Sequence, residues 1–145
     1  MIKAIGLTKI FRTESVQTIA LNEISIDISE GEFVAIMGPS GCGKSTLLNI
    51  LGLLDNPTSG ELWFIGKEVS RYSENDRTDM RNGNIGFVFQ NYNLLPVLNV
   101  YENIVYPIEI DGGKTDTRFV KEIIHTLGSV SYTHLRAHET PEHLV

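Results

Sequence analysis

A glycine-rich segment followed by lysine and serine is the group of residues best suited to chemistry. Gly38-Pro-Ser-Gly-Cys-Gly-Lys-Ser45 has the spacing G-x-x-x-x-G-K-[ST], which binds the phosphates of nucleotides. Glycines let the backbone curl round a phosphate and turn its N–H groups inward, because no Cβ obstructs them. We expect Lys44 to reach the β- and γ-phosphates and the Ser45 hydroxyl to bind Mg²⁺.

The phosphate-binding residues that we expect are those of the loop and the threonine after it: Gly38, Pro39, Ser40, Gly41, Cys42, Gly43, Lys44, Ser45 and Thr46. A helix that starts here adds about half a positive charge at its N-terminus. At 4 Å and an effective dielectric near 20, Lys44 would attract a phosphate charge by about 4 kcal/mol. A chance match is the alternative, and the strand–loop–helix setting argues against it. Cys42 could be a redox group, but we favour a small side chain at a variable loop position.

The elements around the loop must hold it in place. Residues 20–29 alternate apolar and polar side chains, which indicates a half-buried strand. Phe33–Met37 is a continuous apolar run, which predicts a strand covered on both faces of a sheet. Residues 45–54 are expected to form a helix that ends near Asn56-Pro57.

The remaining pattern alternates strands with helices. We expect strands at 61–65 and 85–89, with a helix at 73–80 between them. A helical pattern begins at Val100 and is interrupted at Pro107, and residues 115–127 indicate an amphipathic helix closed by Gly128. This alternation predicts an α/β domain.

Composition limits the classes of function. The chain has 145 residues, enough for one modest domain, with 41% hydrophobic and 21% charged residues. Its net charge of -6 argues against nucleic acid as a partner. No apolar run approaches the roughly 20 residues needed to cross a bilayer, and no signal peptide is visible, so we expect a cytoplasmic protein without direct membrane insertion. Cys42, the one cysteine, cannot form an internal disulfide.

The residues around the loop resemble those of the ATP-binding subunits of ATP-binding-cassette (ABC) transporters. The matching segments are Ala20-Leu-Asn22 with Ile28, Gly31 to Leu48, Gly52-Leu-Leu-Asp55, Pro57-Thr-Ser-Gly60, Ile85 to Pro96 and Tyr101-Glu-Asn-Ile104. The chain is most similar to the subfamily that powers macrolide export and lipoprotein release. The resemblance covers residues 1–128. It implies an α/β P-loop NTPase fold of ABC type, with an N-terminal antiparallel β part and an incomplete mixed or parallel sheet with helices.

The resemblance also implies two nucleotide contacts outside the loop. Phe11 stands where the family places an aromatic residue, usually tyrosine, that stacks on adenine; the alternative is an ordinary core phenylalanine. Gln90 stands where the family's glutamine reaches Mg²⁺ and the attacking water and senses the membrane subunit. Gln90 is therefore expected to be catalytic together with Lys44, and to bind metal together with Ser45. Residues 91–106 match the region that touches the membrane subunit, although their apolar side chains could equally be core.

Three later motifs of the family are absent from the 145 residues: the L-S-G-G-Q signature, an apolar strand ending in Asp-Glu, and a switch histidine. We therefore interpret residues 1–128 as the N-terminal part of an ABC nucleotide-binding domain, which alone binds ATP weakly and hydrolyses it very slowly. In the family fold the Asp-Glu strand pairs beside the strand expected at 33–37. Without that strand, 33–37 would keep an unpaired edge and be prone to aggregation.

Residues 129–145 differ in character from the rest and show no resemblance to the family. Their sequence looks like translated sequencing adapter, and we interpret this tail as foreign or disordered. The alternative is a small metal site of His134, His138 and His143, which lie four and five residues apart. Pro141 breaks that helical face, and no cysteine or carboxylate pattern supports a metal site.

Taken together, the resemblance implies that the parent protein is the ATP-hydrolysing subunit of an ABC exporter or lipoprotein-release system, using ATP and Mg²⁺. A homodimer of nucleotide-binding domains would hold two Mg-ATP. A transmembrane permease subunit would keep it at the cytoplasmic face of the inner or plasma membrane. Two alternatives stay open: a non-transport ABC ATPase of DNA repair or translation, and a regulator that binds ATP without hydrolysing it.

Overall fold

The computed structural model describes residues 1–91, 93–110 and 112–126. These residues belong to two compact units, the first spanning Met1–Phe87 and the second beginning at Val88. The predicted tail, 129–145, and its three histidines lie outside the described residues.

The first unit is built on an antiparallel sheet whose strand order is β2-β1-β3-β4. The strands are β1 (Ile2–Arg12), β2 (Gln17–Ile28), β3 (Ser59–Phe64) and β4 (Lys67–Glu68). Ile2 pairs with Ile28 of β2 on one side and with Phe64 of β3 on the other. The strands expected at 20–29 and 61–65 are confirmed within β2 and β3. The residues alone did not predict β1, whereas the antiparallel N-terminal part implied by the resemblance is present.

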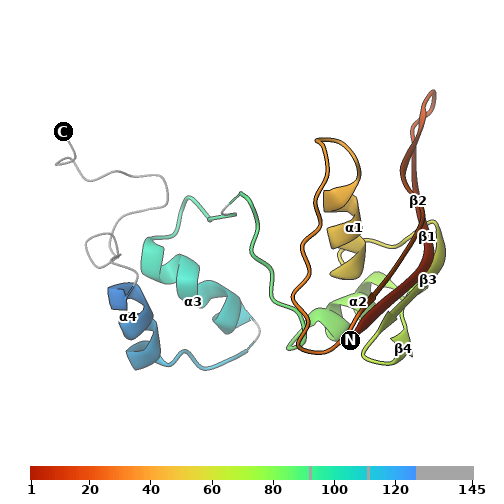
Figure 1. Ribbon diagram of the computed structural model, residues 1–145. Coiled ribbons are helices and arrows are strands. Elements are labelled where there is room, and N and C mark those ends of the chain that lie inside the picture. The colour runs from red at the N-terminus through yellow and green to blue at the C-terminus, as the bar shows by residue number, and fades with distance from the viewer. Residues whose placement is uncertain (92, 111, 127–145) are drawn as a thin grey trace. The chain divides into compact units, whose positions relative to one another are not determined.

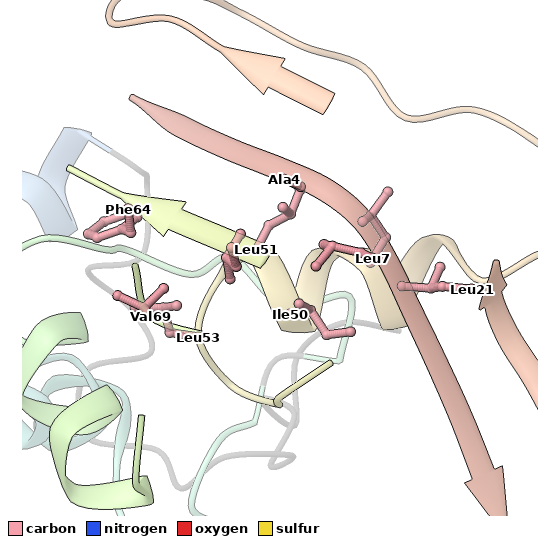
Figure 2. Close-up of a cluster of buried hydrophobic side chains, with 10 residues drawn as sticks. Ala4, Leu7, Leu21, Ile50, Leu51, Leu53, Phe64 and Val69 are labelled. Atoms are coloured by element: carbon pink, nitrogen blue, oxygen red, sulfur yellow. The ribbon is translucent and has the colours of Figure 1, made fainter. Parts of the chain in front are cut away.

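Two helices of this unit lie on the same side of the sheet, α1 (Lys44–Leu51) and α2 (Glu74–Arg81) (Figure 1). Leu47, Ile50 and Leu51 are the buried residues of α1. Figure 2 shows Ile50 and Leu51 beside Leu7 of β1, in the core that also includes Leu21 of β2. Burial of this face fixes α1, and with it the loop that precedes it, against the sheet.

The second helix confirms the one expected at 73–80. Ser73 begins it with a capping box: the Ser73 hydroxyl accepts from the N–H of Asp76, and the Asp76 carboxylate accepts from the N–H of Ser73. Near its end, Arg81 donates a short hydrogen bond to the carbonyl of Leu53. This contact attaches α2 to the turn that follows α1.

The second unit contains α3 (Val100–Ile110) and α4 (Thr117–Thr126). Its core is formed by Val105 of α3 with Val120 and Ile124 of α4. The prediction that Pro107 interrupts the first of these helices is wrong, because α3 continues past it to Ile110. Proline removes one helical hydrogen bond, but tertiary packing supplies most of the stability of a helix in a protein. The helix expected at 115–127 is confirmed over Thr117–Thr126 as α4, and its predicted end at Gly128 lies outside the described residues.

The strands expected at 33–37 and 85–89 are not formed. In the part of the chain that the structure describes, neither segment pairs with another strand, and Phe33 and Met37 are 96% and 88% exposed. An extended apolar run becomes a strand only when a neighbour accepts its backbone hydrogen bonds, and its apolar side chains are buried only when other elements cover them. The apolar side chains at 33–37 and 85–89 are typical of buried strands, but none of the described strands pairs with these segments, and none of the described elements covers them fully.

None of the helices in the described segments is long and apolar enough to cross a membrane.

Candidate nucleotide-binding site

The glycine-rich loop leads directly into α1. That helix begins at Lys44, one residue before the expected start, and ends at Leu51 rather than at Leu54. Gly43 is the N-cap residue and has a left-handed backbone conformation with φ of 94°. A Cβ at Gly43 would lie 2.3 Å from the carbonyl oxygen of Ala20 on β2. Glycine at this position therefore lets the loop pass close to the sheet before the helix starts.

The N-terminus of α1 has the features of an anion site. The first N–H groups of a helix have no acceptor within the helix, and they carry a partial positive charge. Among the described side chains none caps α1, and its first turn contains no acidic residue. The first intrahelical bond runs from the N–H of Leu47 to the carbonyl of Gly43. The N–H groups of the preceding helical residues are thus directed toward the loop.

The ammonium group of Lys44 lies inside the curve of the loop. Its Nζ donates to the carbonyls of Gly38 at 2.9 Å and Pro39 at 2.6 Å. The Cys42 thiol lies 3.6 Å from the same nitrogen. Two backbone carbonyls of the loop therefore hold the positive charge of Lys44 beside Gly38 and Pro39, and its contact with the β- and γ-phosphates stays a prediction.

Cys42 is exposed and fills the space beside Gly38. A Cβ on Gly38 would lie 2.8 Å from the Cys42 sulfur. This close approach fits the interpretation of Cys42 as a small side chain in a tight loop.

We expect Gly43→Ala to destabilise the first unit more than Gly41→Ala. Both glycines have positive φ, 94° at Gly43 and 79° at Gly41, so alanine is strained by about 1–3 kcal/mol at either position. A Cβ at Gly41 meets nothing within 4 Å, whereas at Gly43 it collides with the backbone of Ala20. Urea unfolding of the two variants measures the difference. Equal losses in the free energy of unfolding would contradict the close approach.

The other candidate residues divide between the two units. Ser45 is exposed in the first turn of α1, and Thr46 beside it is half-buried. Phe11, on β1, is 46% exposed, so its ring is available to a ligand. Gln90 is exposed in irregular chain and belongs to the second unit. The pairing of Gln90 with Ser45 at one metal ion stays a prediction.

The sequence analysis missed two contacts of Lys9, one with the Phe11 ring and one with Asp55. Lys9 Nζ lies 5.2 Å from the centroid of the Phe11 ring, and Lys9 also forms a salt bridge with Asp55. Lys9 and Phe11 are two residues apart on one strand, a spacing that places both side chains on one face and could have indicated their contact. No local pattern indicates the salt bridge between Lys9 and Asp55.

The residues present fit a nucleotide with its magnesium ion. Within residues 1–91, 93–110 and 112–126, no group of three His, Cys, Asp or Glu side chains could hold a metal by itself. The Ser45 hydroxyl stands at the same helix end as the ammonium of Lys44 and the N–H groups of the first turn. A hard cation that takes oxygen ligands from one side chain and from phosphates suits this set.

Comparison with known proteins identifies relatives over most of the chain. The family model described as ABC transporter matches residues 21–144. A macrolide export ATP-binding/permease protein, MacB, of Chlorobaculum tepidum is 46% identical over 118 residues, which are 81% of this chain and 18% of that protein. The lipoprotein-releasing system ATP-binding protein LolD of Psychrobacter arcticus is 37% identical over 142 residues, 98% of this chain and 63% of that protein. The chain spans about half the length of the first curated relatives it matches.

A solved structure has the same fold. It is the dimeric post-hydrolysis state of the ATP-binding cassette MJ0796 bound to ADP and Pi, with a TM-score of 0.84 and 34% sequence identity. The match covers 97% of this chain and 63% of that one. This likeness confirms the predicted α/β P-loop fold class.

Proposed function

The chain belongs to the ABC transporter family, and on this premise we propose that it binds Mg-ATP at the loop Gly38–Ser45 and that the intact protein hydrolyses ATP to power a transporter. The observation that carries the proposal is the position of Lys44. Its ammonium lies within the loop, held by the carbonyls of Gly38 and Pro39, at the N-terminus of a helix that no described side chain caps. Positive charge and free N–H groups thus meet at one place, as a triphosphate requires.

Each residue of the site has a separate task in this proposal. Lys44 exchanges its loop carbonyls for oxygens of the β- and γ-phosphates, and the first N–H groups of α1 donate to the same phosphates. Phe11 stacks on adenine. Ser45 and Gln90 would each offer an oxygen ligand to Mg²⁺, which would neutralise the charge that develops on the phosphates during hydrolysis. Gln90 also orients the attacking water.

The names of relatives suggest the partners. MacB is a macrolide export ATP-binding/permease protein, and LolD is the ATP-binding protein of a lipoprotein-releasing system. The solved cassettes are dimers. We infer that two copies of the intact protein hold two Mg-ATP between them and act through a transmembrane permease at the cytoplasmic face of the membrane, in export or lipoprotein release. Transport that continued without nucleotide in a Lys44→Ala protein would contradict this function.

The binding part of the proposal can be tested on the 145-residue chain. We expect Mg-ATP at 100 times its dissociation constant to raise the free energy of unfolding by about 2.7 kcal/mol, because the ligand binds only the folded state. Thermal melting measures this, with AMP and Mg²⁺ as the control. In Ser45→Ala, magnesium should no longer increase the affinity for ATP, while binding of ATP in excess chelator is unchanged. Absence of any stabilisation by triphosphates would overturn the assignment.

A further inference from the structure

The ammonium group of Lys9 contacts three groups from two parts of the first unit. Its Nζ donates to Asp55 Oδ1 at 2.7 Å and to the carbonyl of Asn56 at 2.7 Å. The same nitrogen lies over the Phe11 ring, 5.2 Å from its centroid. The Lys9 side chain is only 14% exposed, against 37% for Asp55. Lys9 is therefore held in one place rather than extended into solvent, as surface lysines are.

The two oxygen acceptors of Lys9 are themselves attached to the helix that carries the phosphate loop. The N–H groups of Leu54 and Asp55 donate to the carbonyl of Asn49 in α1, at 2.8 and 3.2 Å. Asp55 Oδ1 also accepts from the N–H of Asn56 at 2.7 Å. Hydrogen bonds thus run without a break from α1, through the turn at 54–56, to Lys9, and a cation–π contact continues to the Phe11 ring. The C-terminal end of the helix is connected to the aromatic ring on β1.

A cation over an aromatic ring affects how that ring binds a base. The faces of a phenyl ring carry partial negative charge, so an ammonium is attracted to one face and opposes rotation of the ring. It also draws electron density toward itself, which reduces the repulsion between the ring and the electron-rich π system of a purine stacked on it. Phe11 is 46% exposed, so the contact with Lys9 leaves ring surface available for stacking.

We propose that Lys9 is a positioning residue for the nucleotide base. It holds and polarises the Phe11 ring, and through Asp55 and Asn56 it sets the position of that ring relative to the helix that binds the phosphates. This inference rests on the proposed function, because it presupposes that Phe11 stacks on adenine.

The test compares ligands with and without a base in the 145-residue chain. Lys9→Met keeps the length of the side chain and removes its charge. By calorimetry we expect it to weaken Mg-ATP binding about two- to fivefold, the lower range for a cation–π contact, and to leave Mg-tripolyphosphate binding unchanged. A merely structural role would weaken both ligands alike, so an equal loss for tripolyphosphate would overturn the proposal.

A double-mutant cycle sharpens the test. In a Phe11→Ala background, Lys9→Met should have no further effect on Mg-ATP affinity, because the ring through which Lys9 acts is gone. The same loss in both backgrounds would overturn the inference. If Lys9→Met does not fold, Asp55→Asn provides the second variant: it weakens the anchor of the ammonium and should lower ATP affinity selectively. Failure of the unaltered chain to bind Mg-ATP would refute the proposed function, whereas normal binding without a Lys9 effect refutes only this inference.

Discussion

Replacing Lys44 with alanine is expected to lower the affinity for Mg-ATP about a thousandfold. The ammonium lies within the loop, against the carbonyls of Gly38 and Pro39, where a bound phosphate would be close to it. At 4 Å and an effective dielectric near 20 the attraction is about 4 kcal/mol, and each 1.4 kcal/mol is a factor of ten in affinity. Titration calorimetry with Mg-ATP measures the loss.

Lys67→Ala is the matched control for the lost charge. Lys67 is an exposed lysine on β4 of the same unit, so its removal changes the net charge equally and leaves the loop intact. We expect it to bind Mg-ATP as the unaltered chain does. Melting of nucleotide-free Lys44→Ala checks that the loop still folds without the two carbonyl contacts. Undiminished binding by a folded Lys44→Ala chain would show that the loop is not the phosphate site.

The second large effect is expected from Phe11→Ala. Base–aromatic stacking stabilises a complex by about 1–3 kcal/mol, so the affinity for Mg-ATP should fall roughly 5- to 150-fold. The ring is 46% exposed, so its removal leaves a smaller cavity than truncation of a fully buried residue such as Ile50. The free energy of unfolding should change little. Calorimetry with Mg-ATP and urea unfolding separate the two effects.

Phe11→Tyr keeps the aromatic face and serves as the conservative control for this position. It should retain most of the affinity for Mg-ATP. Binding of Mg-tripolyphosphate should be the same in all three chains, since that ligand has no base. If Phe11→Ala bound Mg-ATP normally, Phe11 would be an ordinary strand residue, which is the alternative that its sequence position left open.

The parts of the molecule that were predicted from sequence are those encoded by neighbouring residues. The loop was recognised because its glycines, Lys44 and Ser45 follow one another at fixed spacing. Helix α2 was predicted from a polar stretch rich in Asp and Arg, and the capping box of Ser73 and Asp76 shows that its start is also determined locally. In such cases the residues that determine the structure lie within a few positions of one another, so a short stretch of sequence is enough to predict it.

The parts that were missed depend on partners far along the chain. The apolar run Phe33–Met37 has the composition of a central strand, but no described strand pairs with it, so composition alone gave the wrong element. The contact of Lys9 with Asp55 joins residues 46 positions apart. The need for glycine at position 43 arises from the carbonyl of Ala20, which belongs to another element. All three features depend on residues that are distant in the sequence, and a short sequence pattern does not identify those partners.

The strand order β2-β1-β3-β4 has a consequence for biosynthesis. Of the four strands of this sheet β1 leaves the ribosome before the others; it lies between β2 and β3, and β3 ends only at Phe64. At about 5–20 residues per second, β1 waits on the order of seconds for its second neighbour. During that interval only two strands of this sheet, β1 and β2, can pair, and an isolated two-stranded hairpin is marginally stable in water. The apolar face of that hairpin, with Leu7 and Leu21, then remains accessible to chaperones until β3 and α1 cover it.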